Sequence, residues 1–292
     1  MKINKLDINN AKEIKYFYNF VCKIHDHGHS DFTKDFFLFK ESMINKNLII
    51  FLSHSKNLID NYFMIEQEKK INRTIIKSLD ISKIFQYHEI INTIDFSTSV
   101  ETGIRDSETS KILSNKKFRP TETYNFMELE KTNYKGSKVN IDEKLFQRKS
   151  FDIKTDLEKL TNLQNICFRN HHGYQENRPQ DILREINYIK KDNKNNYILG
   201  LINPKNEWVG YAWSYYNLED KIGKLLMCGS LKNYRNHGLA SSIVNFSINH
   251  LFELGCKKIR LEVDNNNSFA KKIYSKMGFN EYDNLKWYEL TK

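Results

Sequence analysis

The segment Tyr234-Arg-Asn-His-Gly-Leu-Ala240, together with the residues after it up to Phe279, decides the fold of this chain. Gly238 allows a ligand to approach the backbone closely. The segment opens a helix, so that unpaired backbone N–H groups and the positive end of the helix dipole face outward. Such a helix start binds anions, and Arg235 adds a planar cation suited to phosphate. Alone, the pattern is equally typical of an ordinary turn, so its meaning depends on the residues from Ser241 to Phe279.

These residues show a regular alternation of helix and strand signals. The first helix has one broad apolar face, made of Ile243, Val244, Ile248, Leu251 and Phe252. Gly255 is the expected end of this helix. Apolar and charged residues then alternate over Ile259–Val263, as in a half-buried strand. Asn267 is expected near the cap of a second helix, which contains Tyr274 and ends at Gly278.

This order resembles the GNAT superfamily of acetyl-CoA-dependent N-acetyltransferases. The family pattern is R-x-x-G-x-A, a helix, L-x-V, and then N-x-x-A-x-x-x-Y-x-x-x-G-F. The matching residues are Arg235, Gly238, Ala240, Leu261, Val263, Asn267, Ala270, Tyr274, Gly278 and Phe279. The resemblance implies an α/β fold, with a mixed, mostly antiparallel sheet flanked by helices, and acetyl-CoA as the acetyl donor.

The resemblance also implies roles for individual residues. The pyrophosphate of CoA would lie on the loop residues Arg235, Asn236, His237, Gly238, Leu239, Ala240 and Ser241. The pantetheine arm would bond the preceding strand at Cys228, Ser230 and Leu231, and also Asn267. Tyr274 would be the general acid for the leaving thiolate, the alternative being an aromatic ring packed on a helix face. The strand Lys224–Ser230 departs from the family because it holds no carboxylate, which leaves the general base unassigned.

The acceptor is expected on the opposite side from the donor. His171 and Tyr174, between the first two helices, and Tyr211 and Trp213, on the third strand, form a candidate aromatic pocket. The alternative is that these aromatics belong to the core. His172 or Glu219 is the preferred general base from a wider set that also holds His171, Glu176, Glu207 and Glu262. Small metabolites, antibiotics, peptide N-termini and lysine side chains all remain open as the amine.

The chain contains the same module twice. Residues 6–28 align without gaps on 151–173, and Lys111–Phe118 resembles Lys272–Phe279. The first copy has no R-x-x-G-x-A, and Leu113 stands where the second copy has Tyr274. We therefore expect a degenerate GNAT-like domain over 1–135, a linker over 136–147 and an acetyl-CoA-binding catalytic domain over 148–292. This tandem arrangement is loosely similar to the mycothiol synthase branch.

Charge and cysteine content indicate which ligands, partners and cellular location to expect. From Arg148 onward there are 23 Lys and Arg against 16 Asp and Glu, a surplus that suits a polyanionic donor. The dispersed lysines form no basic stripe, which argues against nucleic acid as a partner. The four scattered cysteines indicate buried thiols in a reducing cytosol, and no signal or membrane segment is recognised, so a cytoplasmic protein is expected. His25, His27 and His29 alternate in an expected loop and need not converge on one ion, so no metal is predicted.

Together these features predict an enzyme that transfers acetyl from acetyl-CoA directly to a primary amine of a small molecule or peptide. The alternative is a non-catalytic CoA-binding sensor or scaffold built from paired GNAT modules. The absent strand carboxylate favours the alternative, whereas Tyr274 favours the enzyme, since binding alone does not require its hydroxyl. The sequence leaves the oligomeric state open.

Overall fold

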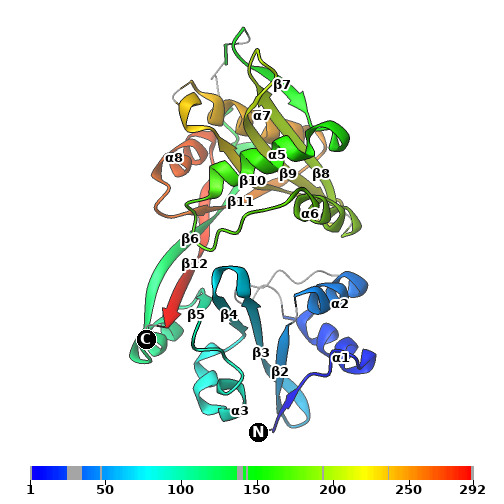
Figure 1. The fold of residues 1–292 in the computed structure, drawn as a ribbon, viewed down its shortest axis with the longest axis vertical. Helices are drawn as coiled ribbons and strands as arrows, with labels where there is room; N and C mark the ends of the chain where they lie inside the picture. The colour runs from blue at the N-terminus through cyan, green and yellow to red at the C-terminus, as the bar shows by residue number, and fades with distance from the viewer. Residues whose placement is uncertain are drawn as a thin grey trace. The chain divides into compact units, whose positions relative to one another are not determined.

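The computed structural model describes residues 2–24, 35–46, 48–136, 141–142, 144–192, 194–235 and 237–290. The chain forms two compact units (Figure 1): unit 1 is Met1–Thr123 with Asn284–Lys292, and unit 2 is Tyr124–Asp283. The linker expected at 136–147 lies within unit 2. The divisions at Thr123 and Asn284 both fall inside strands. Each unit therefore contains one strand that comes largely from the opposite half of the sequence.

The sheet of unit 2 is mixed. Its strands run in the order β6 (Phe118–Glu130), β11 (Lys258–Asp264), β10 (Ile222–Ser230), β9 (Trp208–Asn217), β8 (Lys194–Ile202) and β7 (Gln147–Ser150). Strands β10 and β11 are parallel, and the other neighbours pair antiparallel. Strand β6 comes from the end of the first copy, yet it pairs with β11 from Tyr124↔Asp264 to Glu130↔Lys258.

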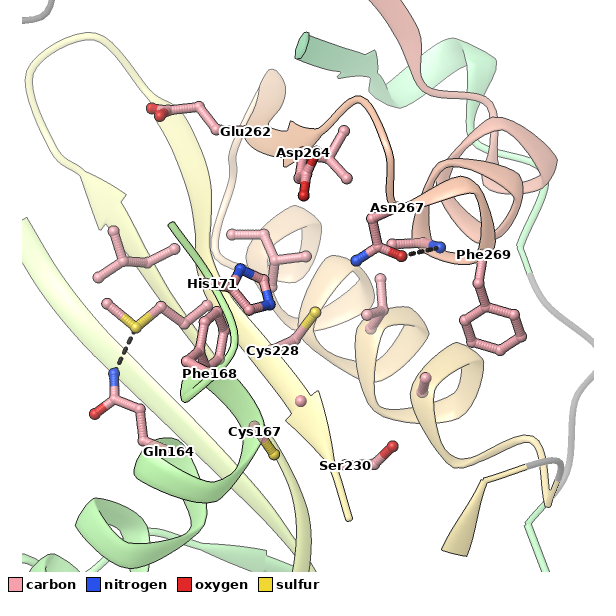
Figure 2. A pocket seen from close by; sticks show the side chains of 18 of the residues that line it. Gln164, Cys167, Phe168, His171, Cys228, Ser230, Glu262, Asp264, Asn267 and Phe269 are labelled. Atoms are coloured by element: carbon pink, nitrogen blue, oxygen red, sulfur yellow. Dashed lines mark hydrogen bonds between the residues drawn. The ribbon is translucent and has the colours of Figure 1, made fainter. Parts of the chain in front are cut away.

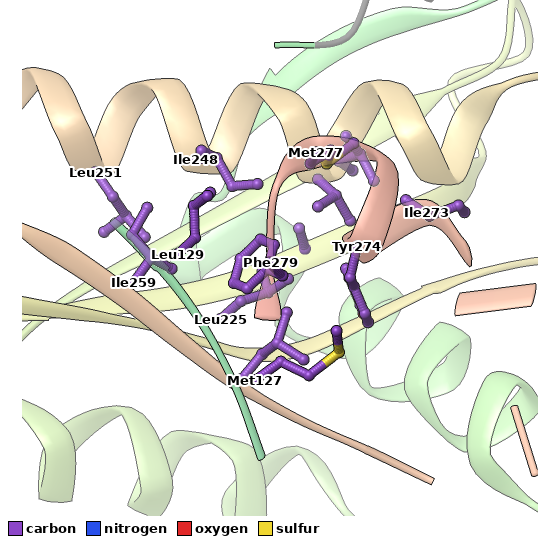
Figure 3. Packing of buried hydrophobic residues seen from close by; sticks show 14 of the residues in the cluster. Met127, Leu129, Leu225, Ile248, Leu251, Ile259, Ile273, Tyr274, Met277 and Phe279 are labelled. Atoms are coloured by element: carbon purple, nitrogen blue, oxygen red, sulfur yellow. The ribbon is translucent and has the colours of Figure 1, made fainter. Parts of the chain in front are cut away.

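Helices cover both faces of this sheet. They are α5 (Ile153–Phe168), α6 (Pro179–Lys191), α7 (Leu239–Glu253) and α8 (Ser268–Met277), with the short 3-10 helices η3 (Lys131–Asn133) and η4 (Lys232–Tyr234). Helix α7 buries the apolar face expected from its sequence against α8 and the strands, as Figure 3 shows for part of this cluster. On β9, Tyr211, Trp213 and Tyr215 face the α5 and α6 cluster, whereas Tyr216 joins the α7 cluster. This is the alternation that the strand pattern predicts.

Unit 1 repeats the plan. Its sheet order is β1 (Lys2–Lys5), β2 (Ile49–Ser55), β3 (Leu58–Glu68), β4 (Arg73–Ser78), β5 (Ser99–Ile104) and β12 (Asn280–Leu290). Helices α1 (Ala11–Val21) and α2 (Phe36–Asn45) pack on one core cluster. A second cluster holds residues of η2 (Ile81–Gln86), α3 (His88–Ile91) and α4 (Ser107–Asn115). The remaining short helix is η1 (Lys69–Ile71).

The two units differ at one place that matters for ligand binding. Between its two parallel strands unit 2 has the fifteen-residue helix α7, whereas unit 1 has only η2 and the four-residue helix α3. Leu113, the counterpart of Tyr274, is wholly buried in the core. The first module therefore has the GNAT-type sheet but lacks the long helix whose start would bind an anion. Within the described ranges, no helix combines the length and apolar character needed to span a membrane.

Candidate active site

The two parallel strands of unit 2 separate part of the way along their length. Strands β10 and β11 pair from Ile222↔Lys258 to Leu225↔Leu261. Beyond an irregularity between Leu225 and Met227, β10 continues paired only with β9, as far as Ser230↔Gly210. Both strands line a cavity past this point, with residues 225–230 on one side and 262–264 on the other. The separation exposes the edge of β10 to the cavity, where backbone groups are available to a ligand.

The cavity has a volume of about 840 Å³ and is lined by residues of α5, the turn after α5, β10, α7, β11 and α8, among other segments. Figure 2 shows Cys228 on β10, Asn267 at the start of α8 and His171 beyond the end of α5. Of the residues predicted from the sequence, the cavity is lined by His171, His172, Tyr174, Cys228, Ser230, Arg235, Ala240, Glu262, Asn267 and Tyr274. Residues distant in sequence therefore meet at one concave surface, which is the usual form of a small-molecule site.

One end of the cavity is the start of α7. Gly238 is the N-cap residue with φ +74°, a left-handed conformation that glycine adopts without strain. Gly238 has no side chain, so the N-cap residue itself does not occupy the first N–H groups of the helix. Arg235 lines the same end. This combination of helix start and guanidinium is suited to a phosphate-bearing ligand.

Of the described residues of the predicted loop, His237, Leu239 and Ser241 are not among those that line the cavity. Leu239 is buried in the core, and the ring of His237 packs on Phe146 with ring centroids 6.0 Å apart. Leu231 donates its backbone N–H to Val209, at 2.9 Å. Ser241 lies in the first turn of α7, and Asn236 falls outside the described residues.

The two polar atoms of the Asn267 side chain lie in different surroundings. Its Oδ1 accepts a hydrogen bond from the Ala270 backbone N–H, at 3.1 Å, and so caps α8. Its Nδ2 amino group is directed into the cavity in Figure 2. Asn267 can therefore start the helix and still donate a hydrogen bond to a ligand.

Tyr274 lies on α8. Its ring packs in the core cluster, and the residue also lines the cavity. The ring packs on Phe279, with centroids 5.7 Å apart, and the hydroxyl lies 3.2 Å from the Cys228 Sγ. Burial, together with the neighbouring Cys228, raises the pKa of the Tyr274 phenol well above its ordinary value. The phenol is therefore protonated at neutral pH, which is the form that a general acid requires.

The predicted acceptor residues divide into two groups. His171, His172 and Tyr174 lie in the turn after α5 and line the cavity. Tyr211 and Trp213 do not, because the α5 and α6 side of β9 is covered by those helices, and both residues are wholly buried there. Trp213 Nε1 donates to Asn196, at 2.8 Å. Glu219 is exposed in the turn between β9 and β10, away from the cavity lining.

Several cavity residues were not predicted as site residues from the sequence, among them Asp264, Gln164 and Cys167. Asp264 ends β11 and, with Glu262, brings carboxylates to the lining. Glu262 pairs with Lys224, at 2.7 Å, and Asp264 accepts from the Asn266 backbone N–H, at 2.8 Å. Gln164 and Cys167 reach the cavity from α5. A polar residue on the apolar face of α5 is the one signal that would have drawn attention to Gln164.

The histidines at positions 25, 27 and 29 fall outside the described residues. Among the residues that the structure does describe, no cluster of three or more His, Cys, Asp or Glu side chains is arranged to hold a metal ion. The chemistry that these cavity side chains offer is phosphate binding, hydrogen bonding and proton transfer.

Comparison with known proteins agrees with this geometry. Residues 157–279 match the acetyltransferase (GNAT) family. A segment of 77 residues is 27% identical to mycothiol acetyltransferase of Streptomyces griseus, and one of 69 residues is 34% identical to N-alpha-acetyltransferase MAK3 of Arabidopsis thaliana. These segments span 25% and 36% of the two relatives and about a quarter of this chain.

The solved structures extend the likeness to the whole chain. The tandem GNAT protein from the clavulanic acid biosynthesis pathway covers 99% of this chain over 97% of its own length, with a TM-score of 0.71 and 9% identity. Identity this low shows the fold alone. The chain thus has the tandem GNAT fold, and residues 157–279, which carry most of the cavity, match the acetyltransferase (GNAT) family.

Proposed function

We propose that unit 2 transfers an acetyl group from acetyl-CoA directly to a primary amine. The observation that carries the proposal is the single cavity onto which the β10 edge, the start of α7, Asn267 and Tyr274 all open. A diphosphate-bearing acyl carrier needs an anion site, donors along a flexible arm and a proton donor beside its sulfur. The family match over residues 157–279 supports the same transfer.

The residues present fit acetyl-CoA. Arg235 and the backbone around Gly238 would hold the pyrophosphate, and Asn267 with the β10 edge at Cys228 and Ser230 would hold the pantetheine arm. Bound there, acetyl-CoA supplies the thioester that the amine attacks. The β10 backbone N–H groups that point away from β9 are the donors available to polarise a carbonyl. Tyr274 would protonate the leaving sulfur.

The amine must lose a proton before or during attack. We propose His172 as the proton acceptor because it lines the cavity. Glu219 does not line the cavity, so we propose no catalytic role for it. The acceptor would enter along the turn after α5, beside His171 and Tyr174. We propose a small molecule or a peptide amine as the acceptor.

The test is calorimetric titration of acetyl-CoA into the full chain, followed by thiol-release assays with polyamines, amino acids, aminoglycosides and peptides. We expect one site per chain, since unit 1 lacks a counterpart of α7 among its described residues. Arg235→Ala combined with Gly238→Asp should abolish binding, because it removes a cation, strains the loop and adds a negative charge. Lys205→Ala, in the exposed turn between β8 and β9, is the matched control.

The outcomes separate the candidate functions. Binding with thiol release by an amine supports the transferase. Binding without release by any amine would instead favour a CoA-binding sensor or scaffold. Absence of binding would overturn both.

A further inference from the structure

The connection between α5 and α6 forms part of the cavity wall. It runs over residues 169–178 and contains no helix or strand before α6 begins at Pro179. Five of its residues line the cavity: His171, His172, Tyr174, Gln175 and Asn177. The proposed acceptor enters on this side, so the shape of the acceptor site depends on how the connection is held.

One side chain of α5 holds the far end of this connection. The Asn165 Nδ2 donates to the Asn177 backbone carbonyl, at 2.9 Å, and the Asn177 backbone N–H donates to the Asn165 Oδ1, at 3.0 Å. An amide side chain has both a donor and an acceptor, so Asn165 pairs with Asn177 as the backbone of a neighbouring strand would. Both backbone groups of Asn177 are thereby satisfied, although the residue belongs to no helix or strand.

The near end of the connection is held by local contacts. The His171 backbone N–H donates to the Phe168 carbonyl, at 2.8 Å, and the Tyr174 backbone N–H donates to the His171 carbonyl, at 3.1 Å. The ring of His171 also packs on Phe168, with centroids 4.7 Å apart, and both residues are labelled in Figure 2. The Asn165–Asn177 contact joins residues twelve positions apart. It therefore closes the whole connection into a loop against α5.

The first copy of the module indicates that the fold does not require this amide. In the ungapped alignment of residues 6–28 on 151–173, Phe20 stands at the position of Asn165. Phe20 packs against the core of unit 1, and a phenyl ring cannot pair with backbone groups as an amide does. The amide is thus present in the copy that has α7 and the cavity, which associates it with ligand binding.

We propose that Asn165 is a positioning residue for the acceptor, because it fixes residues 166–177 in the conformation in which His171, His172 and Tyr174 line the cavity. The inference rests on the proposed acetyl transfer and concerns the affinity of that site for the amine. Asn165 does not itself line the cavity, so it acts through the loop and not by touching the acceptor. With the loop held in advance, binding of the amine does not carry the free-energy cost of ordering it.

Two substitutions of Asn165 remove different parts of the contact. Asn165→Ala removes both hydrogen bonds. Asn165→Asp keeps an acceptor for the Asn177 backbone N–H but has no donor, and it places a carboxylate against the Asn177 carbonyl. Asn162→Ala is the matched control, since Asn162 is an exposed asparagine one turn earlier on the same helix.

The first measurement is amide hydrogen exchange of the full chain without ligands, followed by mass spectrometry of overlapping peptides. We expect residues 170–177 as a group to exchange several-fold faster in Asn165→Ala, because the loop opens more often once the contact is lost. Asn162→Ala should exchange like the wild type. Faster exchange at Asn177 alone would mean that other contacts hold the loop, and it would overturn the proposal.

The second measurement separates the affinity for the amine from the affinity for acetyl-CoA. The amine probes are spermidine, lysine, kanamycin and trialanine, assayed by thiol release, and calorimetry gives the Kd of acetyl-CoA. For each amine that the wild type acetylates, we expect both Asn165 variants to raise KM by roughly tenfold. The value of kcat should change less, because the bound amine orders the loop again. The Kd of acetyl-CoA should be unchanged.

Each other outcome has a distinct meaning. An unchanged KM for the amine, or weaker binding of acetyl-CoA, would overturn the inference while leaving the acetyl transfer intact. The same rise in KM in Asn162→Ala would show a general effect on α5 and would also overturn it. If Asn165→Ala does not fold, Asn165→Asp is measured in the same way, and failure of both to fold would make the amide structural. Binding of acetyl-CoA by the wild type without thiol release by any amine would overturn the proposed function, and this inference with it.

Discussion

The thiol of Cys228 lies 3.2 Å from the hydroxyl of Tyr274, and the contact joins β10 to α8 in the wall of the cavity. Burial is the main reason that the pKa of each group is raised. Both groups are therefore protonated at neutral pH, and either can be the donor. When the thiol donates, the phenolic hydrogen of Tyr274 is free to be directed at a ligand. The contact therefore predicts a positioning role for Cys228, which can be tested apart from Tyr274.

Replacing Tyr274 with Phe should lower kcat by tenfold or more, on the order expected for loss of a general acid. Acetyl-CoA affinity should stay nearly constant, because the ring still packs on Phe279. Thiol-release kinetics and calorimetry measure the two quantities. Tyr282→Phe, at a partly exposed tyrosine outside the cavity, is the control. Unchanged turnover in Tyr274→Phe would remove the hydroxyl from the mechanism.

Replacing Cys228 separates hydrogen bonding from packing. Cys228→Ser keeps a donor beside Tyr274, so turnover should stay within a few-fold of wild type. Cys228→Ala removes the donor and should lower kcat by roughly tenfold, the equivalent of one hydrogen bond. Steady-state kinetics across pH 6–9 would check both variants. Equal turnover in the two variants would contradict a positioning role.

Asn267→Asp should divide the two functions of this residue. Asp caps a helix about as well as Asn, so the melting temperature should be nearly unchanged. Acetyl-CoA affinity should fall by roughly tenfold or more, because a carboxylate cannot donate a hydrogen bond and repels a diphosphate. Asn267→Ala should lose both affinity and about 1 kcal/mol of stability, as expected for a lost cap. Wild-type affinity in Asn267→Asp would show that Nδ2 has no ligand.

Gly255 and Gly278 each follow a helix, and replacing each with alanine separates the effect of backbone strain on stability from the effect of a steric clash. Gly278 has φ +104°, and an added Cβ would lie 2.2 Å from the Asn133 carbonyl oxygen. Gly255 has φ +95° and nothing within 4 Å of an added Cβ. Gly255→Ala should lower the free energy of unfolding by about 1 kcal/mol through backbone strain alone. Gly278→Ala should lose about 1–3 kcal/mol more through the clash, as measured by urea denaturation. Equal losses would contradict the contact.

The cysteines should alkylate in an order set by burial. Burial raises the pKa of Cys167 to about 11 and that of Cys256 to about 12, whereas Cys22 is exposed. The thiolate is the reactive form, so Cys22 should react first with iodoacetamide at pH 8. Below its pKa, the thiolate fraction of Cys167 rises about tenfold for each pH unit, so its rate should rise with pH. Mass spectrometry of timed samples would measure this order, and early labelling of Cys256 would contradict it.

Local patterns in the sequence were sufficient to predict the helix start at Gly238 and the elements that follow it. Gly238 lies in the left-handed region at the start of α7, and Asn267 caps α8, as their positions predicted. The apolar face of α7 and the alternation over Ile259–Val263 are buried as expected. These features depend on backbone conformation and on side-chain period within one element, which neighbouring residues determine.

Only the tertiary structure shows which strands pair with one another and which helices cover them. Strand β6 pairs with β11, and β12 pairs with β5, although the sequence repeat alone indicates two separate halves. Tyr211 and Trp213 lie on the strand face that the alternation predicts. Helices α5 and α6 cover that face, so neither residue lines the cavity. The contact of Gln164 with Met227 joins residues that are 63 positions apart in the chain. Each of these features depends on residues that are far apart in the sequence: the pairing of strands between the two halves, the covering of a strand face by helices, and the contact of a buried side chain. Periodicity and motif spacing within one segment therefore do not determine them.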